Sequence, residues 1–310
     1  MNHSNPRINK LISIVVMLLL GLFSFGQEFK KNKYTHQLEL RHDNDFFVFL
    51  DQYYTSGLYL TYRKSLNKGI FSENAEQIYF TLGQEIYTPS QKETIQTSTF
   101  DRPYAGFLGL HSGWSMVCKN QFYEAKLLLG YTGKFSGGGG FQRWYHKMTG
   151  FDSPLWVKEL NTTFHTNLYL AYAKEYMAPF GASLAIQPTL AAGSRDIYAE
   201  NGVALFLGTR NTMQKSNAYH RWGGADDELF VTINLAYRYV FYNGLIEGNL
   251  FGDDSRVLRT PEESVFKAGI DLNHQHKRNS YHVGVRFNTK ETPRAKAHAY
   301  VQVAYAYAFK

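Results

Sequence analysis

Three segments of the sequence carry side chains whose types and spacing could do chemistry. In the first, Asp43-Asn44-Asp45 precedes the hydroxyl pair Thr55 and Ser56. Carboxylate, amide and hydroxyl oxygens are the hard ligands that Ca²⁺ takes. The spacing is not that of an EF-hand loop, however, and Asp/Asn clusters are common in plain turns. This segment therefore indicates either a metal site or a turn.

The second segment reads Asp-Arg-Pro-Tyr-Ala-Gly over residues 101–106. Its arginine, Arg102, is the residue type that captures phosphate or carboxylate groups. The structural alternative is that proline and glycine shape the start of a strand while the arginine reaches toward a membrane interface. The residues alone leave both interpretations open.

The third segment, FQRWYHKMTGFD, runs from Phe141 to Asp152 and has the spacing of a short amphipathic helix. Gln142 and His146 are four residues apart and share one face. His146 could act as a general base on water, with Gln142 or Asp152 orienting it. A lone loop histidine is more often structural, so the motif by itself leaves catalysis open. Apolar residues recur on another face at i, i+3, i+4 and i+7, namely Phe141, Trp144, Tyr145 and Met148.

Stretches around these segments alternate with period two, with one apolar face and one small or polar face, as in 229–241, 281–287 and 297–310. The chain has 23 Tyr, 23 Phe and 4 Trp, yet its mean hydropathy is −0.36. A transmembrane β-barrel explains both, because lipid-facing and lumen-facing residues cancel in the average. A soluble sandwich also alternates. Tyrosines near the ends of the apolar faces, and Phe309 next to the C-terminus, favour the membrane barrel.

We predict a single all-β domain, a transmembrane antiparallel β-barrel of about twelve strands with a short helix in an extracellular loop. The strands are expected near residues 34–43, 53–66, 74–87, 106–118, 121–133, 161–175, 180–193, 200–209, 227–241, 262–274, 279–289 and 297–309. An even number suits a bacterial single-chain barrel.

The strand count also places the three segments. If the barrel starts in the periplasm, the connections near 44–52, 88–105 and 134–160 are extracellular, so the segments converge at one rim. No Lys-Ser/Thr follows Gly137–Gly140, so this run is not a phosphate loop. We interpret the glycines as giving the loop freedom to fold over the barrel.

The N-terminus reads as a signal peptide, residues 1–26, before a barrel domain of residues 27–310. A basic n-region holds Arg7 and Lys10, the apolar stretch 11–25 follows, and Ser24 and Gly26 fit a cleavage site. A transmembrane anchor is the alternative, but the apolar core is short for one. These features predict the bacterial outer membrane as the location.

Further features of the sequence limit which classes of function and partner are expected. The formal charge is +7, and Cys118 is the single cysteine. The sequence has no Gly-x-Ser-x-Gly elbow and no His-Glu-x-x-His. We predict outer-membrane lipids as partners and no nucleic-acid partner. A closed barrel has no open edge, so we expect a monomer.

The three segments together resemble the outer-membrane lipid A 3′-O-deacylase (LpxR-like) family. The resemblance rests on NDFF…DQYYTSGLYLTY at 44–62, DRPYAGFLGL at 101–110 and QRWYHKMTGFDSPLW at 142–156. It implies a twelve-stranded barrel with an active site between the wall and an extracellular-loop helix. It also implies a carboxylic ester hydrolase that removes the 3′-linked acyloxyacyl group of lipid A in a Ca²⁺-dependent, phospholipase-A2-like way. The substrate would be lipid A, or lipopolysaccharide, in the outer leaflet.

Carried onto matching positions, the resemblance implies a role for each candidate residue. Asn44 and Asp45 would form the metal site, and His146 would activate water beside Gln142 and Asp152. Arg102 would contact the phosphorylated sugar, with Thr55 and Ser56 also in the substrate site. The chain departs from the family pattern at four positions: Asp152 for glutamate, Ser56 for asparagine, Leu155 for glycine and Glu159 for glutamine.

Two other functions stay open. An outer-membrane phospholipase would need a serine nucleophile paired with a histidine, and no particular serine can be paired from sequence. A non-catalytic barrel, either a channel or a structural protein, is the alternative of another class. The channel is weakened by bulky residues expected in the lumen, namely Tyr59, Tyr169, Tyr300, Arg63 and Arg238.

Overall fold

The structure is a computed structural model that describes residues 34–48, 51–66, 68–71, 75–222 and 227–310. The signal-peptide prediction for residues 1–26 lies outside these residues. Among the described residues, no helix has the length and apolar character needed to cross a membrane.

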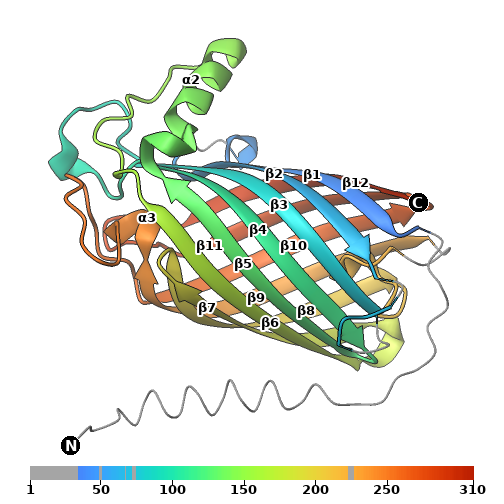
Figure 1. Cartoon of the computed structure of the whole chain (residues 1–310). Helices are drawn as coiled ribbons and strands as arrows, with labels where there is room; N and C mark the ends of the chain where they lie inside the picture. Colours follow the sequence, from blue (N-terminus) through green and yellow to red (C-terminus); the bar gives the residue numbers. More distant parts are fainter. Residues whose placement is uncertain (1–33, 49–50, 67, 72–74, 223–226) are drawn as a thin grey trace, which may run out of the picture.

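Twelve antiparallel strands form a closed barrel in which each strand pairs with its sequence neighbours and β1 pairs with β12 (Figure 1). This confirms the predicted fold. The strands are β1 His36–Asn44, β2 Tyr53–Ser65, β3 Ala75–Thr88, β4 Ala105–Cys118, β5 Gln121–Thr132, β6 Phe164–Met177, β7 Ser183–Gly193, β8 Asp196–Thr209, β9 Glu228–Asn243, β10 Ser264–His276, β11 Asn279–Asn288 and β12 His298–Phe309.

The alternating residues of each strand divide between the outside of the wall and the lumen. In β12, Val303, Tyr305 and Tyr307 are exposed, whereas Gln302 and Ala304 are buried. Apolar side chains on the outer face and polar ones within are the pattern of a barrel that lipid surrounds. The outward face therefore forms an apolar belt around the molecule.

Both α-helices and three of the 3-10 turns in the described part of the chain lie at one end of the barrel, which we call the α2 rim. It carries η1 Phe46–Val48, η2 Thr97–Thr99, η3 Gly133–Ser136, α2 Gly138–Thr149 and α3 Gly244–Glu247. The opposite rim carries η4 Pro179–Gly181 and η5 Asn217–Tyr219. The three connections with candidate chemistry all lie at the α2 rim, as strand parity predicts. Figure 1 shows α2, in green, projecting outward beyond the outline of the barrel.

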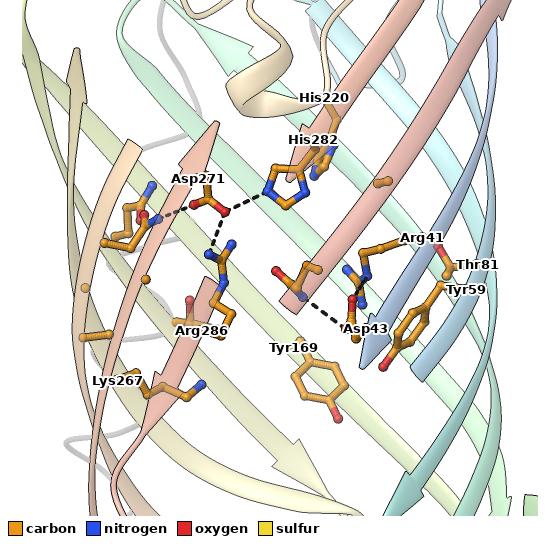
Figure 2. Close-up of a pocket in the computed structure, with 18 of the residues that line it drawn as sticks. Arg41, Asp43, Tyr59, Thr81, Tyr169, His220, Lys267, Asp271, His282 and Arg286 are labelled. Atoms are coloured by element: carbon orange, nitrogen blue, oxygen red, sulfur yellow. Dashed lines mark hydrogen bonds and ion pairs between the residues drawn. The ribbon is translucent and has the colours of Figure 1, made fainter. Parts of the chain in front are cut away.

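The lumen holds a cavity of about 800 Å³ lined by charged and tyrosine side chains (Figure 2). Several of the side chains that line this cavity form ion pairs with one another. In one of them, Asp271 lies between His282 and Arg286, at 2.7 and 2.6 Å. The bulky residues expected in the lumen do line this cavity, namely Tyr59, Tyr169, Tyr300, Arg63 and Arg238.

Candidate active site

A second cavity, of about 400 Å³, lies at the α2 rim and brings most of the candidate residues together. Its lining includes Asn44, Asp45, Thr55, Ser56, Gln142, His146 and Asp152, whereas Asp43 lines the lumen cavity and Arg102 lines neither. We call this space the rim cavity. Residues about a hundred positions apart in sequence therefore converge on one site.

The rim cavity lies on the outside of the barrel wall. Asn44 and Ser56 are paired across β1 and β2, and Asn44 shares the outward face of β1 with the exposed Leu38 and Leu40. Ile86 of β3 also lines the cavity and is buried. The cavity thus lies between α2 and the outer surface of the wall, which is the place that the resemblance implies.

The end of β1 is held in a tight turn by its own polar side chains. The Asn44 Oδ1 accepts a hydrogen bond from the Phe46 N–H at 2.7 Å, and Asp45 Oδ2 accepts one from the Gln52 N–H at 2.8 Å. Asp45 Oδ1 is buried and has no hydrogen-bond partner among the residues that the structure describes. Burial raises the pKa of the Asp45 carboxyl to about 8, because an ionised carboxylate loses its hydration there. The turn and metal interpretations are therefore compatible.

A β-bulge shapes the facing side of the rim cavity. The pairing of β2 with β3 shifts register between Tyr54 and Ser56, so Thr55 is an extra residue in the strand. A bulge re-aims the side chains next to it. Thr55 and Ser56, although adjacent, both line the cavity as a result. The Thr55 hydroxyl shares a 2.9 Å hydrogen bond with the hydroxyl of Thr88.

Two of the four glycines at the start of α2 have a packing role, besides the freedom that the sequence suggests for this loop. Gly137 has a φ of 70° and caps the helix. A Cβ on Gly138 would lie 2.8 Å from the Gly106 Cα, and one on Gly139 would lie 2.9 Å from Trp156. The first turn of α2 thus docks closely on the start of β4 and on an indole ring. Close approach needs glycine here because any side chain would collide.

The main chain orients His146. Its Nδ1 lies 2.7 Å from the backbone carbonyl of Asp152, and a carbonyl can only accept. Nδ1 therefore carries the proton, and Nε2 has the free lone pair of a base. The Asp152 carboxylate is exposed, so the contact with His146 is made by the backbone and not by the shortened side chain.

Gln142 is fixed beside His146. Its Oε1 accepts a 2.7 Å hydrogen bond from Trp156 Nε1, and the Trp156 ring stacks on Tyr104 at 5.2 Å. The Gln142 Nε2 is buried without a hydrogen-bond partner. Gln142 and His146, the predicted polar face of the helix, are its buried face.

Arg102 does not line the rim cavity. Its guanidinium is buried 3.4 Å from Glu291 and lies over the Tyr87 ring, 4.4 Å from the centroid. Both partners line the lumen cavity, on the other side of the wall. Strand alternation could not reveal this, because Arg102 precedes the first residue of β4. The phosphate contact that the resemblance implies for Arg102 stays a prediction.

Sequence reasoning missed several lining residues. Lys92 forms an ion pair with Asp51, and both face the rim cavity with Phe151. Phe151 packs on Phe46 with ring centroids 4.9 Å apart. Lys92 belongs to no motif, so only the fold could place it. Phe151 lies within the segment 141–152, and its aromatic side chain was the feature that could have identified it as a lining residue.

The donor set of the rim cavity can accept one hard cation. The described residues contain no cluster of three or more His, Cys, Asp or Glu side chains that could hold a metal ion. Ca²⁺, however, also takes amide and backbone carbonyl oxygens and water. The buried Asp45 Oδ1 without a partner supplies the charged ligand, and Asn44 lies beside it. These residues fit Ca²⁺ held mainly by Asp45.

The chain matches known proteins over nearly its whole length. The family model described as outer membrane protein LpxR matches residues 11–309. Among solved structures, LpxR from Salmonella typhimurium is similar with a TM-score of 0.73 and 17% identity, covering 88% of this chain and all of that one. No curated protein sequence matches the chain.

Two other solved barrels share less of the structure. The β domain of the Bordetella autotransporter BrkA has a TM-score of 0.43 and 10% identity, covering 88% of this chain and 98% of that one. The translocator domain of the autotransporter NalP from Neisseria meningitidis has a TM-score of 0.43 and 9% identity, covering 97% of this chain and 95% of that one.

Proposed function

We propose, from the premise that the chain belongs to the outer membrane protein LpxR family, that it is a lipid A deacylase. The reaction would be hydrolysis of the 3′-linked acyloxyacyl ester of lipid A, in the outer leaflet of the outer membrane. One observation supports the chemistry above all: in a cavity on the outside of the wall, His146 has Nδ1 tied to a carbonyl while Asp45 presents an unpaired oxygen.

His146 would act as the general base. With Nδ1 protonated and bound to the Asp152 carbonyl, Nε2 can take a proton from a water as it attacks the ester carbonyl. The ring then becomes an imidazolium and can return the proton to the leaving alkoxide. Gln142, held by Trp156, has a free N–H₂ group with which to orient water or substrate.

Asp45 and Asn44 would hold Ca²⁺. When bound, the ion would polarise the ester carbonyl and stabilise negative charge on its oxygen. Asp45 has the electrostatic character for this role, since its buried carboxylate has one oxygen without any hydrogen bond. A nearby dication would lower the pKa of that carboxyl and keep it ionised.

The position of the rim cavity suits a lipid substrate. It is bounded by the outer wall of a membrane barrel and by aromatic rings of Phe46, Phe141, Tyr145 and Phe151. A lipid in the adjacent leaflet could therefore reach His146 without entering the lumen. Such a position favours a lipid-modifying enzyme over a channel.

The phospholipase alternative has less support. It requires a serine activated by histidine. The His146 ring hydrogen-bonds to the Asp152 carbonyl and, among the described residues, to no serine. A water-activating mechanism needs no such pair.

Mass spectrometry of lipid A tests the proposal. The cells should carry a 3′ acyloxyacyl chain on lipid A and express either the wild type or His146→Ala. We expect loss of the 3′-linked acyloxyacyl group with the wild type and intact lipid A with the variant. Intact lipid A in cells that contain folded wild-type barrel would refute the deacylase assignment.

A further inference from the structure

Two of the four apolar residues of α2, Trp144 and Met148, point away from the protein and form its exposed apolar stripe, whereas Phe141 and Tyr145 line the rim cavity. The buried residues of α2 are Gly138, Gly139, Gln142 and His146, which are small or polar. Trp144 is 55% exposed and Met148 is 68% exposed. A helix on a soluble protein buries its apolar stripe and exposes its polar face. This inversion needs an apolar partner outside the protein.

The stripe continues an apolar surface at the barrel rim. Phe135, just before α2, is 76% exposed and packs on Tyr131 of the lipid-facing belt with centroids 5.8 Å apart. Tyr131 also packs on Phe164 of β6 at 5.1 Å. At the other end of α2, Phe151 and the neighbouring Phe46 are exposed and packed together. The apolar belt of the barrel thus reaches the N-terminal end of the helix, and a second exposed aromatic pair lies at its C-terminal end.

The flank of α2 next to Trp144 and Met148 is basic. Arg143 and Lys147 are exposed, lie one turn apart, and form no ion pair with any described residue. At about 100° per residue, they lie next to Trp144 and Met148 on the exposed surface of the helix. An apolar flank beside a basic flank is the pattern of a helix in a membrane interface with anionic headgroups.

We propose that α2 lies in the interface of the membrane leaflet at the α2 rim, with Trp144 and Met148 in the apolar boundary and Arg143 and Lys147 at anionic lipid headgroups. Figure 1 shows the helix extending sideways beyond the barrel, which is the direction of the surrounding lipid. The inference rests on the membrane barrel and not on the proposed catalysis. The helix then forms one wall of the rim cavity and also the surface along which lipid arrives.

Paired fluorescent labels on adjacent residues test this placement. Met148→Cys and Lys147→Cys are each made with Cys118→Ser, labelled with an environment-sensitive dye and reconstituted in phosphatidylethanolamine vesicles containing phosphatidylglycerol. Both native side chains are exposed, so the pair differs in flank and not in burial. We expect lipid-attached nitroxide to quench position 148 several-fold more than 147, and aqueous iodide to show the reverse order.

Each other outcome overturns part or all of the inference. Equal iodide quenching at both positions would mean that the stripe faces water. Protection at 148 that rises with the protein-to-lipid ratio would assign the stripe to a second copy of the chain. If replacing phosphatidylglycerol with phosphatidylcholine leaves quenching at 148 unchanged, the headgroup role of the basic flank is wrong. None of these readouts depends on turnover, so they stand apart from the deacylase test.

Discussion

His146 is held by a main-chain oxygen, which changes what a neighbouring carboxylate has to do. The resemblance implies a catalytic role for Asp152, whose side chain is one methylene shorter than the glutamate expected in the family. In the structure, the carbonyl of Asp152 accepts from His146 Nδ1 and its carboxylate is exposed. The shortened side chain therefore leaves the orientation of the base intact.

This geometry predicts unequal effects of two substitutions. Asp152→Ala keeps the carbonyl, so we expect deacylation within a few-fold of wild type. His146→Asn removes the base, and loss of a general base costs on the order of 10²–10⁴-fold in rate. The deacylation rates of both variants on purified lipid A in detergent test this. Asp152→Glu is the control for side-chain size. If Asp152→Ala were as inactive as His146→Asn, the carboxylate would have to act on the substrate or the metal.

A second prediction at the level of single residues concerns Asp45 as a calcium ligand. Asp45→Asn removes the charge while keeping the shape, so we expect it to abolish activity and also the rise in melting temperature that CaCl₂ gives the wild type over EDTA. A ligand that binds only the folded state stabilises it by mass action. The matched control is Asp43→Asn, two residues away but facing the lumen, where Asp43 accepts from Tyr54 at 2.9 Å. The control should keep its calcium response.

Full activity of the wild type in excess EDTA would exclude calcium from the mechanism. A calcium-induced thermal shift that survives in Asp45→Asn would place the ion elsewhere. These two outcomes are independent, because one reads turnover and the other reads stability.

At the scale of single elements, α2 depends on how closely its first turn approaches the wall. Gly139→Ala would push a methyl group to 2.9 Å from Trp156, which stacks on Tyr104 and donates to Gln142. Overpacking of this kind costs about 1–3 kcal/mol. Because the indole holds Gln142, a shift of the ring would misplace the polar face of the helix, and a misplacement of about 1 Å can cost on the order of 10²-fold in rate. We therefore expect clearly lower activity.

Gly140→Ala is the matched control, one residue further along the same helix. A Cβ at Gly140 meets nothing within 4 Å. Alanine is favoured over glycine in a helix interior by about 1 kcal/mol. We expect unchanged activity and equal or higher stability. Similar losses in both variants would show that the glycines act through flexibility after all, as the sequence suggested.

The elements also show where sequence reasoning succeeds and where it stops. Alternation locates all twelve strands, and helical spacing locates α2, because both depend on local periodicity. The start of β8 is predicted at residue 200 but lies at Asp196, since a bulge between Ile197 and Tyr198 breaks the phase of alternation. The spacing in α2 cannot say which face is buried, because lipid can cover an apolar face as well as protein can.

The candidate site shows the same division. Motifs identify Asn44, Asp45, Gln142 and His146, and the fold brings them together. Arg102 and Lys92 lie in loops, where no period assigns a side of the wall. Their places depend on contacts between distant segments, such as Arg102 with Glu291, which the sequence does not encode locally.

At the scale of the whole molecule, side-chain contacts join distant segments toward both rims of the barrel. Toward the α2 rim, Arg195 forms an ion pair with Glu85 of β3, nearly opposite in the ring of strands, and its guanidinium lies over the Phe107 ring, 4.5 Å from the centroid. Toward the other rim, Trp222 donates to the Tyr34 carbonyl at 3.2 Å. Arg195 and Glu85 themselves line the lumen cavity, so their ion pair narrows the path across the barrel.

These contacts, together with the bulky side chains of the lumen, predict that the barrel does not conduct ions as a pore. In planar lipid bilayers we expect no porin-like current steps from the wild type, and none from Glu85→Gln/Arg195→Gln, because the Trp222 contact and the other bulky lumen side chains remain in that double variant. Replacing both charged partners avoids the several kcal/mol cost of leaving one buried charge unpaired, so the barrel should still fold. Regular current steps from the wild type would favour the channel alternative. Steps from the double variant alone would show that the Arg195–Glu85 pair is the main barrier and that the Trp222 end is open to ions.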